Sequence, residues 1–178
     1  GVLSGVEDDI SVDEKMAKYT HPDEALQFVN ETKCNSLALA VGTSHGAYKF
    51  SGGQGIQFDI LEKIQKLLPE FPLVLHGGSS VNHEEVNRIN KSGGKLEKTA
   101  SGVAPEEIIK SISYGICKIN IATDTRILWA RIHREFFKDN PDQFDPIIPG
   151  KQYIEAYEKF MLSKFDLLKA TGKANQFN

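Results

Sequence analysis

Two histidines in this sequence follow apolar segments, and each is followed by glycine. In "NSLALAVGTSHG" the apolar segment 36–41 leads to His45, and in "PLVLHGGSS" the segment 73–75 leads to His76. Catalytic zinc sites take three protein ligands, often imidazole nitrogens, and leave one position open. If the two segments are neighbouring strands, both imidazoles can bind one metal ion. The alternative is that each histidine is a polar strand-end residue whose ring hydrogen-bonds to a backbone carbonyl.

The loops that carry these histidines contain features of a phosphate-binding site. Glycine lets a backbone approach a ligand closely, and successive N–H groups bind anions. The residues concerned are Gly46, Gly77 and Gly78, with the ammonium group of Lys49 and the hydroxyl of Ser79 beside them. Ordinary turn chemistry is the alternative explanation for these residues.

A third loop of the same kind follows the apolar segment 116–122. Asn120 and Thr123 end this segment, and a helix capped by Thr123 offers further free N–H groups. Asp124 is favourable at the positive end of that helix. The location of three polar loops at the ends of three apolar segments predicts a single site.

Other titratable residues have weaker claims to chemistry. Glu7 lies in the acidic turn "GVEDDIS", which is either solvated surface or a mobile loop with a general acid or base. His21, His83 and His133 lie on expected helices or at their starts. Capping or contact with solvent is the favoured interpretation for these three.

The elements that position the loops alternate between strand and helix. Strands are expected over 36–41, 73–76 and 116–122. Helices are expected over 20–33 with Thr20 as the N-cap, over 55–68, from about 82, over 105–112, over 123–137 and, after a proline-rich connection, over about 151–171. Such alternation predicts parallel βα units, and a parallel sheet binds ligands at the carboxyl ends of its strands.

The composition is that of an ordinary globular protein. The chain has 178 residues, 40% hydrophobic and 25% charged, with a net charge of −3 and a pI of about 6.0. No nucleic-acid footprint is visible, and no apolar run is long enough to span a membrane. Cys34 and Cys117, in or beside expected buried segments, are interpreted as free thiols, which favours a reducing cytoplasm. The acidic first residues lack an initiator Met and resemble the interior of a protein, so we expect a fragment.

Four motifs together resemble one family. "GVLSGVEDD", "AVGTSHGAYKF", "LVLHGGSS" and "KINIATDTR" are similar to motifs of class II, zinc-dependent fructose-bisphosphate aldolases, and the similarity covers nearly the whole chain. The resemblance implies an α/β fold, the TIM (β/α)8 barrel. This chain, as a single domain over 1–178, would form roughly its C-terminal half plus the C-terminal helices.

The resemblance also implies an activity and an assembly. Family members cleave fructose 1,6-bisphosphate reversibly into dihydroxyacetone phosphate and glyceraldehyde 3-phosphate. Zn²⁺ acts as the electron sink, in place of a lysine Schiff base. A cytoplasmic homodimer or homotetramer is expected, with no nucleic-acid or membrane partner. A monovalent cation, Na⁺ or K⁺, is expected near the phosphate loops.

Site residues are carried over by position. His45 and His76 match zinc ligands, and Glu7 matches a mobile-loop glutamate implicated in proton transfer. The substrate-binding positions are Gly46, Lys49, Gly77, Gly78, Ser79, Asn120, Ala122, Thr123 and Arg126. Of these, Asn120 is expected to contact the enediolate, and Arg126 matches a basic residue near the second phosphate.

The chain also departs from the family pattern. The family's catalytic aspartate, its adjoining zinc histidine and a further liganding glutamate are expected upstream of Gly1. Ala122 stands where the family usually has a substrate-binding aspartate, and Ile147 where it has an arginine. A tagatose-bisphosphate aldolase and a catalytically incomplete phosphate-binding fragment are therefore the alternatives. The half-sheet is expected to expose two unpaired edges, and to need another copy or a missing segment for stability.

Overall fold

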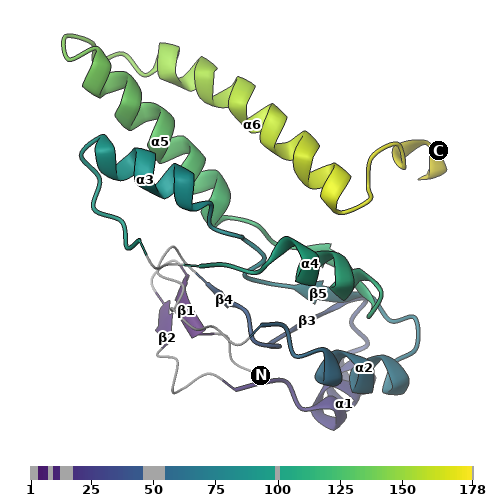
Figure 1. Ribbon diagram of the computed structural model, residues 1–178. Coiled ribbons are helices and arrows are strands. Elements are labelled where there is room, and N and C mark those ends of the chain that lie inside the picture. The colour runs from purple at the N-terminus through teal and green to yellow at the C-terminus, as the bar shows by residue number, and fades with distance from the viewer. Residues whose placement is uncertain (1–3, 8–9, 13–17, 46–54, 99–100, 178) are drawn as a thin grey trace. The chain divides into compact units, whose positions relative to one another are not determined.

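The computed structural model divides into two compact units (Figure 1). The first unit comprises Gly1–Ser80 and Thr99–Thr123, and the second comprises Val81–Lys98 and Asp124–Asn178. The first holds the strands and the second is helical. The expectation of one domain over the whole chain stays a prediction. The residues that the structure describes are 4–7, 10–12, 18–45, 55–98 and 101–177.

Three parallel strands form the main sheet of the first unit. In the order in which they pair, they are β3 (Leu37–Leu39), β5 (Leu73–Leu75) and β6 (Ile116–Ile119). Leu39 pairs with Leu75, which pairs on its other side with Ile119. The predicted parallel arrangement is therefore confirmed. Within the described residues, β3 and β6 are the two edges of this sheet, as expected.

The strands are shorter than the apolar segments that predicted them. β3 ends at Leu39 because the next backbone groups bond outside the ladder. The N–H of Ala40 donates to Thr20 Oγ1 at 2.9 Å, and its carbonyl accepts from the N–H of Thr20 at 2.8 Å. The carbonyl of Val41 accepts from the N–H of Gln57 at 2.8 Å. Residues 40 and 41 are thus buried in a loop, and β6 likewise ends at 119 instead of 122.

A second, small sheet was not predicted from the sequence. It contains β1 (Ser4–Glu7), β2 (Ile10–Val12) and β4 (Ser44–His45), in the order β2-β1-β4. β1 pairs antiparallel with β2 and parallel with β4, which places Gly5 opposite His45. The acidic turn expected around Glu7 is therefore wrong for this residue, which lies in a strand. His45 also has a strand of its own and does not end the strand before it.

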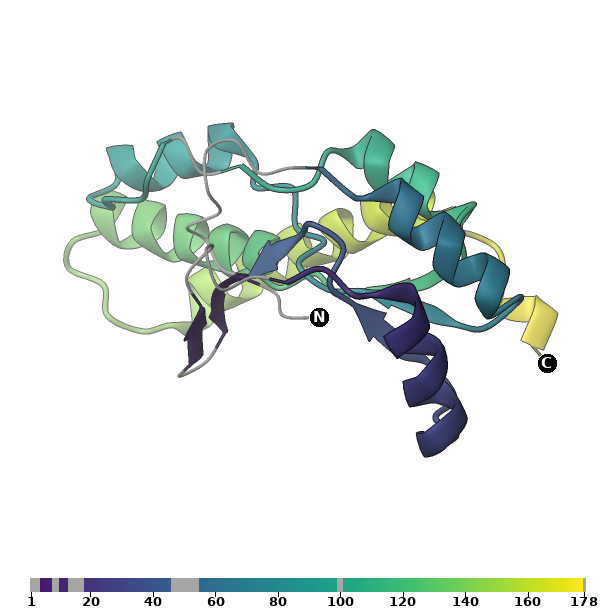
Figure 2. The same ribbon diagram turned by 90° about the horizontal axis from the view of Figure 1, so that it is seen from below.

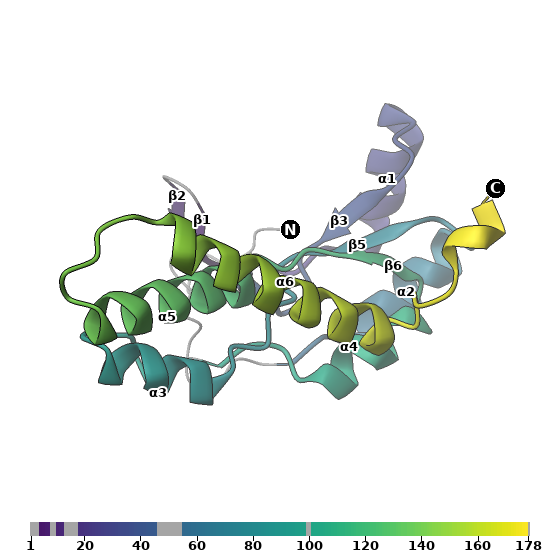
Figure 3. The same ribbon diagram turned by 90° about the horizontal axis from the view of Figure 1, so that it is seen from above.

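The described residues of the first unit form three helices. They are α1 (Pro22–Thr32), α2 (Phe58–Leu67) and α4 (Pro105–Ile112). α2 and α4 lie on the same side of the sheet (Figures 2 and 3). Leu61 and Ile64 of α2 and Ile108 of α4 are fully buried, as are Leu73 and Leu75 of β5. The periodicity of the apolar residues thus predicted the buried faces.

The expected N-cap of α1 is wrong by one residue. The N-cap is His21, whose Nδ1 accepts from the N–H of Asp23 at 3.3 Å. Thr20 is buried instead, and its hydroxyl accepts from Ala40. Threonine is the better cap by propensity, but here the bond to the end of β3 occupies its hydroxyl.

The second unit is built from α3 (His83–Lys91), α5 (Thr123–Asp139) and α6 (Ile147–Leu167), followed by a short 3₁₀ helix, η2 (Ala174–Phe177). α5 and α6 lie side by side, and α3 lies along α5 (Figures 1 and 3). Two arginines join α3 to α5. Arg88 binds Glu135 through two hydrogen bonds of 2.7 Å, and Arg131 binds Glu85 at 2.7 Å and Glu135 at 3.4 Å.

α6 begins four residues earlier than the sequence predicted and ends before 171. Asp145 Oδ1 accepts from the N–H of Ile147 at 2.9 Å, which stabilises the first turn. Pro149 reads as a helix breaker, but it lies in that first turn, where its missing N–H has no partner to lose. The proline-rich segment therefore continues into the helix.

Both cysteines are free, as expected, but Cys117 is exposed and so does not behave as a buried hydrophobe. It lies on the edge strand β6, next to no further strand among the described residues. Cys34 is half-buried. In the described part of the chain, no helix has both the length and the apolar character that a membrane span requires.

Candidate functional site

The carboxyl ends of β5 and β6 are joined by backbone hydrogen bonds. The N–H of Asn120 donates to the carbonyl of Leu75 at 2.8 Å, and the carbonyl of Asn120 accepts from the N–H of Gly78 at 3.0 Å. The loop after β5 therefore lies against the loop after β6. This confirms that two of the three predicted polar loops meet at one edge of the sheet.

The side chains of these loops also meet. Asn120 Nδ2 lies 3.0 Å from Nε2 and 3.4 Å from Nδ1 of His76, which is half-buried. On its other side, the carboxamide oxygen of Asn120 accepts from Lys118 Nζ at 2.6 Å. A predicted metal ligand and a predicted substrate-binding amide are thus neighbours, although they are 44 residues apart in the sequence.

Gly77 brings the loop of His76 to the strand of His45. Its φ is +65°, which favours glycine, and a Cβ built on it would overlap the carbonyl oxygen of Ser44 and lie 3.2 Å from the nitrogen of Ser44. The residue after His76 therefore packs against the residue before His45. The backbones of the two histidines converge, and the approach of their rings stays a prediction.

Gly78 and Gly102 are also required by close packing. A Cβ on Gly78 would overlap the side chain of Ile119, and a Cβ on Gly102 would overlap the carbonyl oxygen of Ser79. The N–H of Gly102 donates to the carbonyl oxygen of Ser80 at 3.1 Å. This bond connects the loop after β5 to the segment before α4. The N–H of Gly78 donates to the Asn120 carbonyl, so what Gly78 contributes to the loop is the absence of a side chain, which permits the close contact with Ile119.

Buried hydroxyl groups lie in the same loops. Ser79 is 2% exposed, and Thr123 and Thr43 are each 6% exposed. Within the described residues, the Oγ1 of Thr43 is buried without a hydrogen-bond partner. A buried hydroxyl in that state is costly unless it bonds to a further group, and Thr43 lies two residues before His45.

The remaining predicted site residues are less well placed. Gly46 and Lys49 lie outside the described residues. Glu7 is on β1, where its backbone pairs with Ile10. Ala122 is exposed in the loop after β6, and Arg126 is exposed on α5 in the second unit.

The other histidines lie on helices or at their starts. His21 caps α1, as expected, and His83 is the exposed first residue of α3. The ring of His133 stacks on Trp129 at 4.1 Å between centroids, and its Nδ1 lies 2.9 Å from the Trp129 carbonyl oxygen.

Sequence reasoning missed Lys118 and Gly102. The signal for Lys118 was the spacing "KIN", because alternate residues of a strand share one face. The signal for Gly102 was the pair "SG" directly before a proline-started helix. Both were passed over because neither resembles a ligand or a catalytic group by itself.

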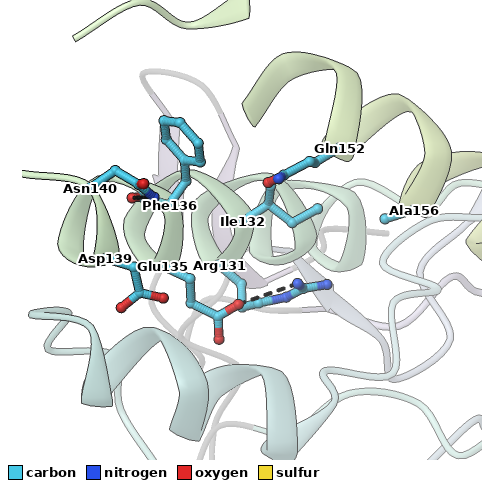
Figure 4. Close-up of a pocket in the computed structure, with 8 residues that line it drawn as sticks. All are labelled: Arg131, Ile132, Glu135, Phe136, Asp139, Asn140, Gln152 and Ala156. Atoms are coloured by element: carbon cyan, nitrogen blue, oxygen red, sulfur yellow. Dashed lines mark hydrogen bonds and ion pairs between the residues drawn. The ribbon is translucent and has the colours of Figure 1, made fainter. Parts of the chain in front are cut away.

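The second unit contains a cleft of about 350 Å³ between α5 and α6 (Figure 4). The Arg131–Glu135 ion pair lies on one side of it, and Gln152 and Ala156 of α6 lie on the other. None of the predicted site residues lines this cleft.

Residues 1–173 match the family described as class-II fructose-bisphosphate aldolase. The chain belongs to this family. The resemblance stated from four motifs is thereby confirmed. The fructose-bisphosphate aldolase of Thermus caldophilus is 43% identical over 178 residues, a match that covers 98% of this chain and 56% of that protein. The fructose-bisphosphate aldolase of Pseudomonas aeruginosa is 38% identical over 160 residues, covering 88% of this chain and 45% of that protein.

Solved aldolase structures share the fold. The YdjI aldolase of Escherichia coli K12 superposes with a TM-score of 0.60 at 29% identity, covering 88% of this chain and 47% of that one. A putative fructose-1,6-biphosphate aldolase of Coccidioides immitis gives 0.68 at 22% identity over 98% of this chain and 52% of that one, which shows the fold alone. The chain thus spans about half the length of its aldolase relatives. The α/β class and the parallel sheet are confirmed, and the closed barrel stays a prediction.

Proposed function

We propose that the protein containing this chain is a zinc-dependent class II aldolase, a lyase of glycolysis. It cleaves fructose 1,6-bisphosphate reversibly into dihydroxyacetone phosphate and glyceraldehyde 3-phosphate. The observation that carries the proposal is the convergence of the strand-end loops, with Gly77 packed on Ser44 and Asn120 against His76. Family membership supports the same activity.

The residues present fit one part of a zinc site. Imidazole nitrogen is a preferred zinc ligand, and the backbones of His45 and His76 approach each other through Gly77 and Ser44. The hydroxyl of Thr43, which has no partner among the described residues, adds a polar group two residues before His45, and the absence of a Cβ at Gly77 permits the close approach to Ser44. No group of three or more potential ligands occurs among the described residues. We therefore propose His45 and His76 as two ligands, with the others supplied from outside the described residues.

The cleavage reaction requires two proton transfers, one from a hydroxyl group of the sugar and one to a carbon atom. When the C3–C4 bond of the ketose breaks, the C4 hydroxyl loses its proton, and C3 keeps the electron pair and takes up a proton. A bound zinc ion would polarise the ketose carbonyl and so lower the energy of that electron pair. Glu7 is proposed to carry the proton of C3, in keeping with its place on β1 beside the strand of His45.

Asn120 and the glycine loop bind the substrate in this proposal. The Nδ2 group of Asn120 donates to the oxygen on which negative charge develops, which is where preorganised donors lower a barrier most. The loop from Gly77 to Ser79, with Thr123, Gly46 and Lys49, binds the phosphate of the ketose. Arg126 is proposed for the second phosphate, and Ala122 lines the substrate without a carboxylate.

Further parts of the proposal concern the whole protein. Exposed apolar side chains of α6, among them Ile154 at 66% and Leu162 at 56% exposure, support a homodimer or homotetramer. Free Cys34 and Cys117 support the cytoplasm. A Na⁺ or K⁺ ion near the phosphate loops completes the cofactors. The two rival substrates, fructose and tagatose 1,6-bisphosphate, differ at one stereocentre.

The test is an assay of the full-length protein with both sugar bisphosphates. We expect turnover that EDTA abolishes and Zn²⁺ restores, and no covalent product after borohydride treatment with substrate. Covalent trapping on a lysine would contradict the mechanism. Faster turnover of tagatose 1,6-bisphosphate would change the substrate, and this chain by itself is expected to have negligible activity.

A phosphate-binding module without catalysis is the second candidate, because only two of the proposed zinc ligands lie in this chain. Calorimetry with dihydroxyacetone phosphate, with and without Zn²⁺, separates the two. Zinc-dependent binding together with turnover supports the aldolase. Binding that is independent of zinc, without turnover by the full-length protein, supports the module.

A further inference from the structure

Lys118 has a contact that the family comparison does not explain. It lies two residues before Asn120, and its Nζ is 2.6 Å from the carboxamide oxygen of Asn120. An ammonium group only donates hydrogen bonds, and a carboxamide oxygen only accepts them. The contact therefore determines which end of the Asn120 carboxamide is the oxygen.

The other end of that carboxamide faces His76. Asn120 Nδ2 lies 3.0 Å from His76 Nε2, and the Asn120 backbone is bonded on both sides to the segment 75–78. Side-chain rotation is thus the freedom that remains to Asn120. A half-turn of the carboxamide would put its NH₂ group against the ammonium of Lys118, two donors together, and would turn its oxygen toward the imidazole.

We propose that Lys118 is a positioning residue that holds the donor edge of Asn120 toward His76. The inference rests on the proposed function for its catalytic meaning. In that reaction the donor edge of Asn120 stabilises the developing negative charge, whereas a reversed carboxamide would present an oxygen and repel it. Lys118 acts through Asn120 and has no substrate contact in this account.

The role predicts a specific pattern of effects. Lys118 is exposed, so its replacement leaves the core intact. Removing the ammonium group frees the carboxamide to rotate, so kcat falls while KM stays near the original value. Lys118→Arg keeps a donor-only group at the end of a long side chain and restores the orientation. A lysine with only a surface role would show no such dependence on the donor.

The experiment compares Lys118→Met, Lys118→Gln, Lys118→Arg and a control, Lys95→Met, in the full-length protein. Lys95 is also exposed, in the loop that follows α3. The first measurement is NMR hydrogen exchange of the Asn120 side-chain NH₂ group, without substrate. We expect about tenfold faster exchange in Lys118→Met, because this variant loses the charge-assisted hydrogen bond that holds the Asn120 side chain. Lys118→Gln, which can both donate and accept, should be intermediate, and Lys118→Arg and Lys95→Met should match the original protein.

The second measurement is steady-state cleavage of fructose 1,6-bisphosphate by the same proteins. We expect kcat to fall about tenfold to a hundredfold in Lys118→Met, the usual range for partners that orient a site residue. If Asn120 exchanges at the same rate in Lys118→Met and Lys118→Gln as in the original protein, the inference is overturned, whatever the activity of these variants. If exchange follows the expected pattern but even the original protein does not cleave the sugar, the proposed function fails and the positioning role stands.

Discussion

At the residue scale, the candidate site depends on glycines at positions where neighbouring atoms leave no space for a side chain. Gly77 combines a left-handed backbone with close contact to Ser44, whereas Gly93 has a similar φ of +84° and no atom within 4 Å of its missing Cβ. A comparison of substitutions at these two glycines therefore distinguishes the free-energy cost of the left-handed backbone from the cost of steric overlap. Only crowding at Gly77 bears on the site.

We predict that Gly77→Ala is more damaging than Gly93→Ala. Both pay about 1–2 kcal/mol for alanine in the left-handed region, but Gly77→Ala must also push apart the loop of His76 and the strand of His45. The expected result is a larger loss in unfolding free energy, together with loss of zinc binding, for Gly77→Ala alone. Urea unfolding and zinc titration of the full-length variants measure this. Equal losses in both variants would mean that the contact with Ser44 is not formed.

A second prediction at this scale concerns Asp124. Its Oδ1 accepts from the N–H of Val81 at 2.8 Å, and its Oδ2 lies 3.3 Å from Lys164 Nζ, with the two side chains 8% and 13% exposed. Val81 is a buried β-branched residue at a φ of +57°, which is unfavourable unless neighbouring groups hold it.

Asp124→Ala should therefore destabilise the protein by about 3–5 kcal/mol, because it leaves a buried ammonium group and an unbonded backbone N–H. Lys164→Met should cost less, because Asp124 keeps its bond to Val81. The measurement is a double-mutant cycle by chemical denaturation, with an expected coupling of about 0.5–3 kcal/mol between the two residues. Strictly additive losses would show that the pair is not formed in solution.

At the element scale, α3 is held to α5 by charged groups. Burial by itself raises the pKa of Glu135, but the hydrogen bonds and charges of Arg88 and Arg131 outweigh it, and the pKa lies below its ordinary value. The hydrogen bond to Glu135 raises the pKa of Arg88 in turn. The carboxylate therefore binds the proton less readily in the folded than in the unfolded chain.

It follows that Glu135 contributes stability above the ordinary glutamate pKa of about 4.3, and that this contribution is lost as the pH falls through its lower folded value. We predict that the stability advantage of the original protein over Glu135→Gln, about 1 kcal/mol at neutral pH for a partly exposed pair, disappears progressively below about pH 5. Urea midpoints measured at several pH values test this. Glu158→Gln, on an exposed part of α6, is the control and is measured in the same way.

The elements that the sequence predicted well are those with strong local patterns. Leu61 and Ile64 recur at helical spacing and are buried in α2. β1 and β4 were missed because they pair with each other across about 40 residues of sequence, and β2 was missed because it exists only by pairing with β1. The start of α6 was missed because Pro149 suggests a loop unless its place in the first turn is known.

The same distinction holds for the candidate site. The residue types at the strand ends predicted which loops come together, since the ends of parallel strands meet at one edge. The orientation of Asn120 between Lys118 and His76 was not predictable, because it depends on backbone bonds to Leu75 and Gly78 that only the fold creates.

At the scale of the whole molecule, the chain is a member of the aldolase family that spans about half the length of its relatives. The parallel sheet ends at β3 and β6 among the described residues, so a closed barrel requires further strands on both sides. We therefore propose that zinc binding and activity belong to the full-length protein, to which this chain contributes His45 and His76.

The most direct measurement is the zinc content of the full-length protein, by mass spectrometry after dialysis against metal-free buffer, compared with His45→Ala, His76→Ala and the exposed control His83→Ala. We predict about one tightly bound Zn²⁺ per chain in the original protein and in the control, as for a catalytic zinc site. Both site variants should lose nearly all of their zinc. Undiminished zinc in His45→Ala and His76→Ala would contradict the proposal that these histidines bind the metal.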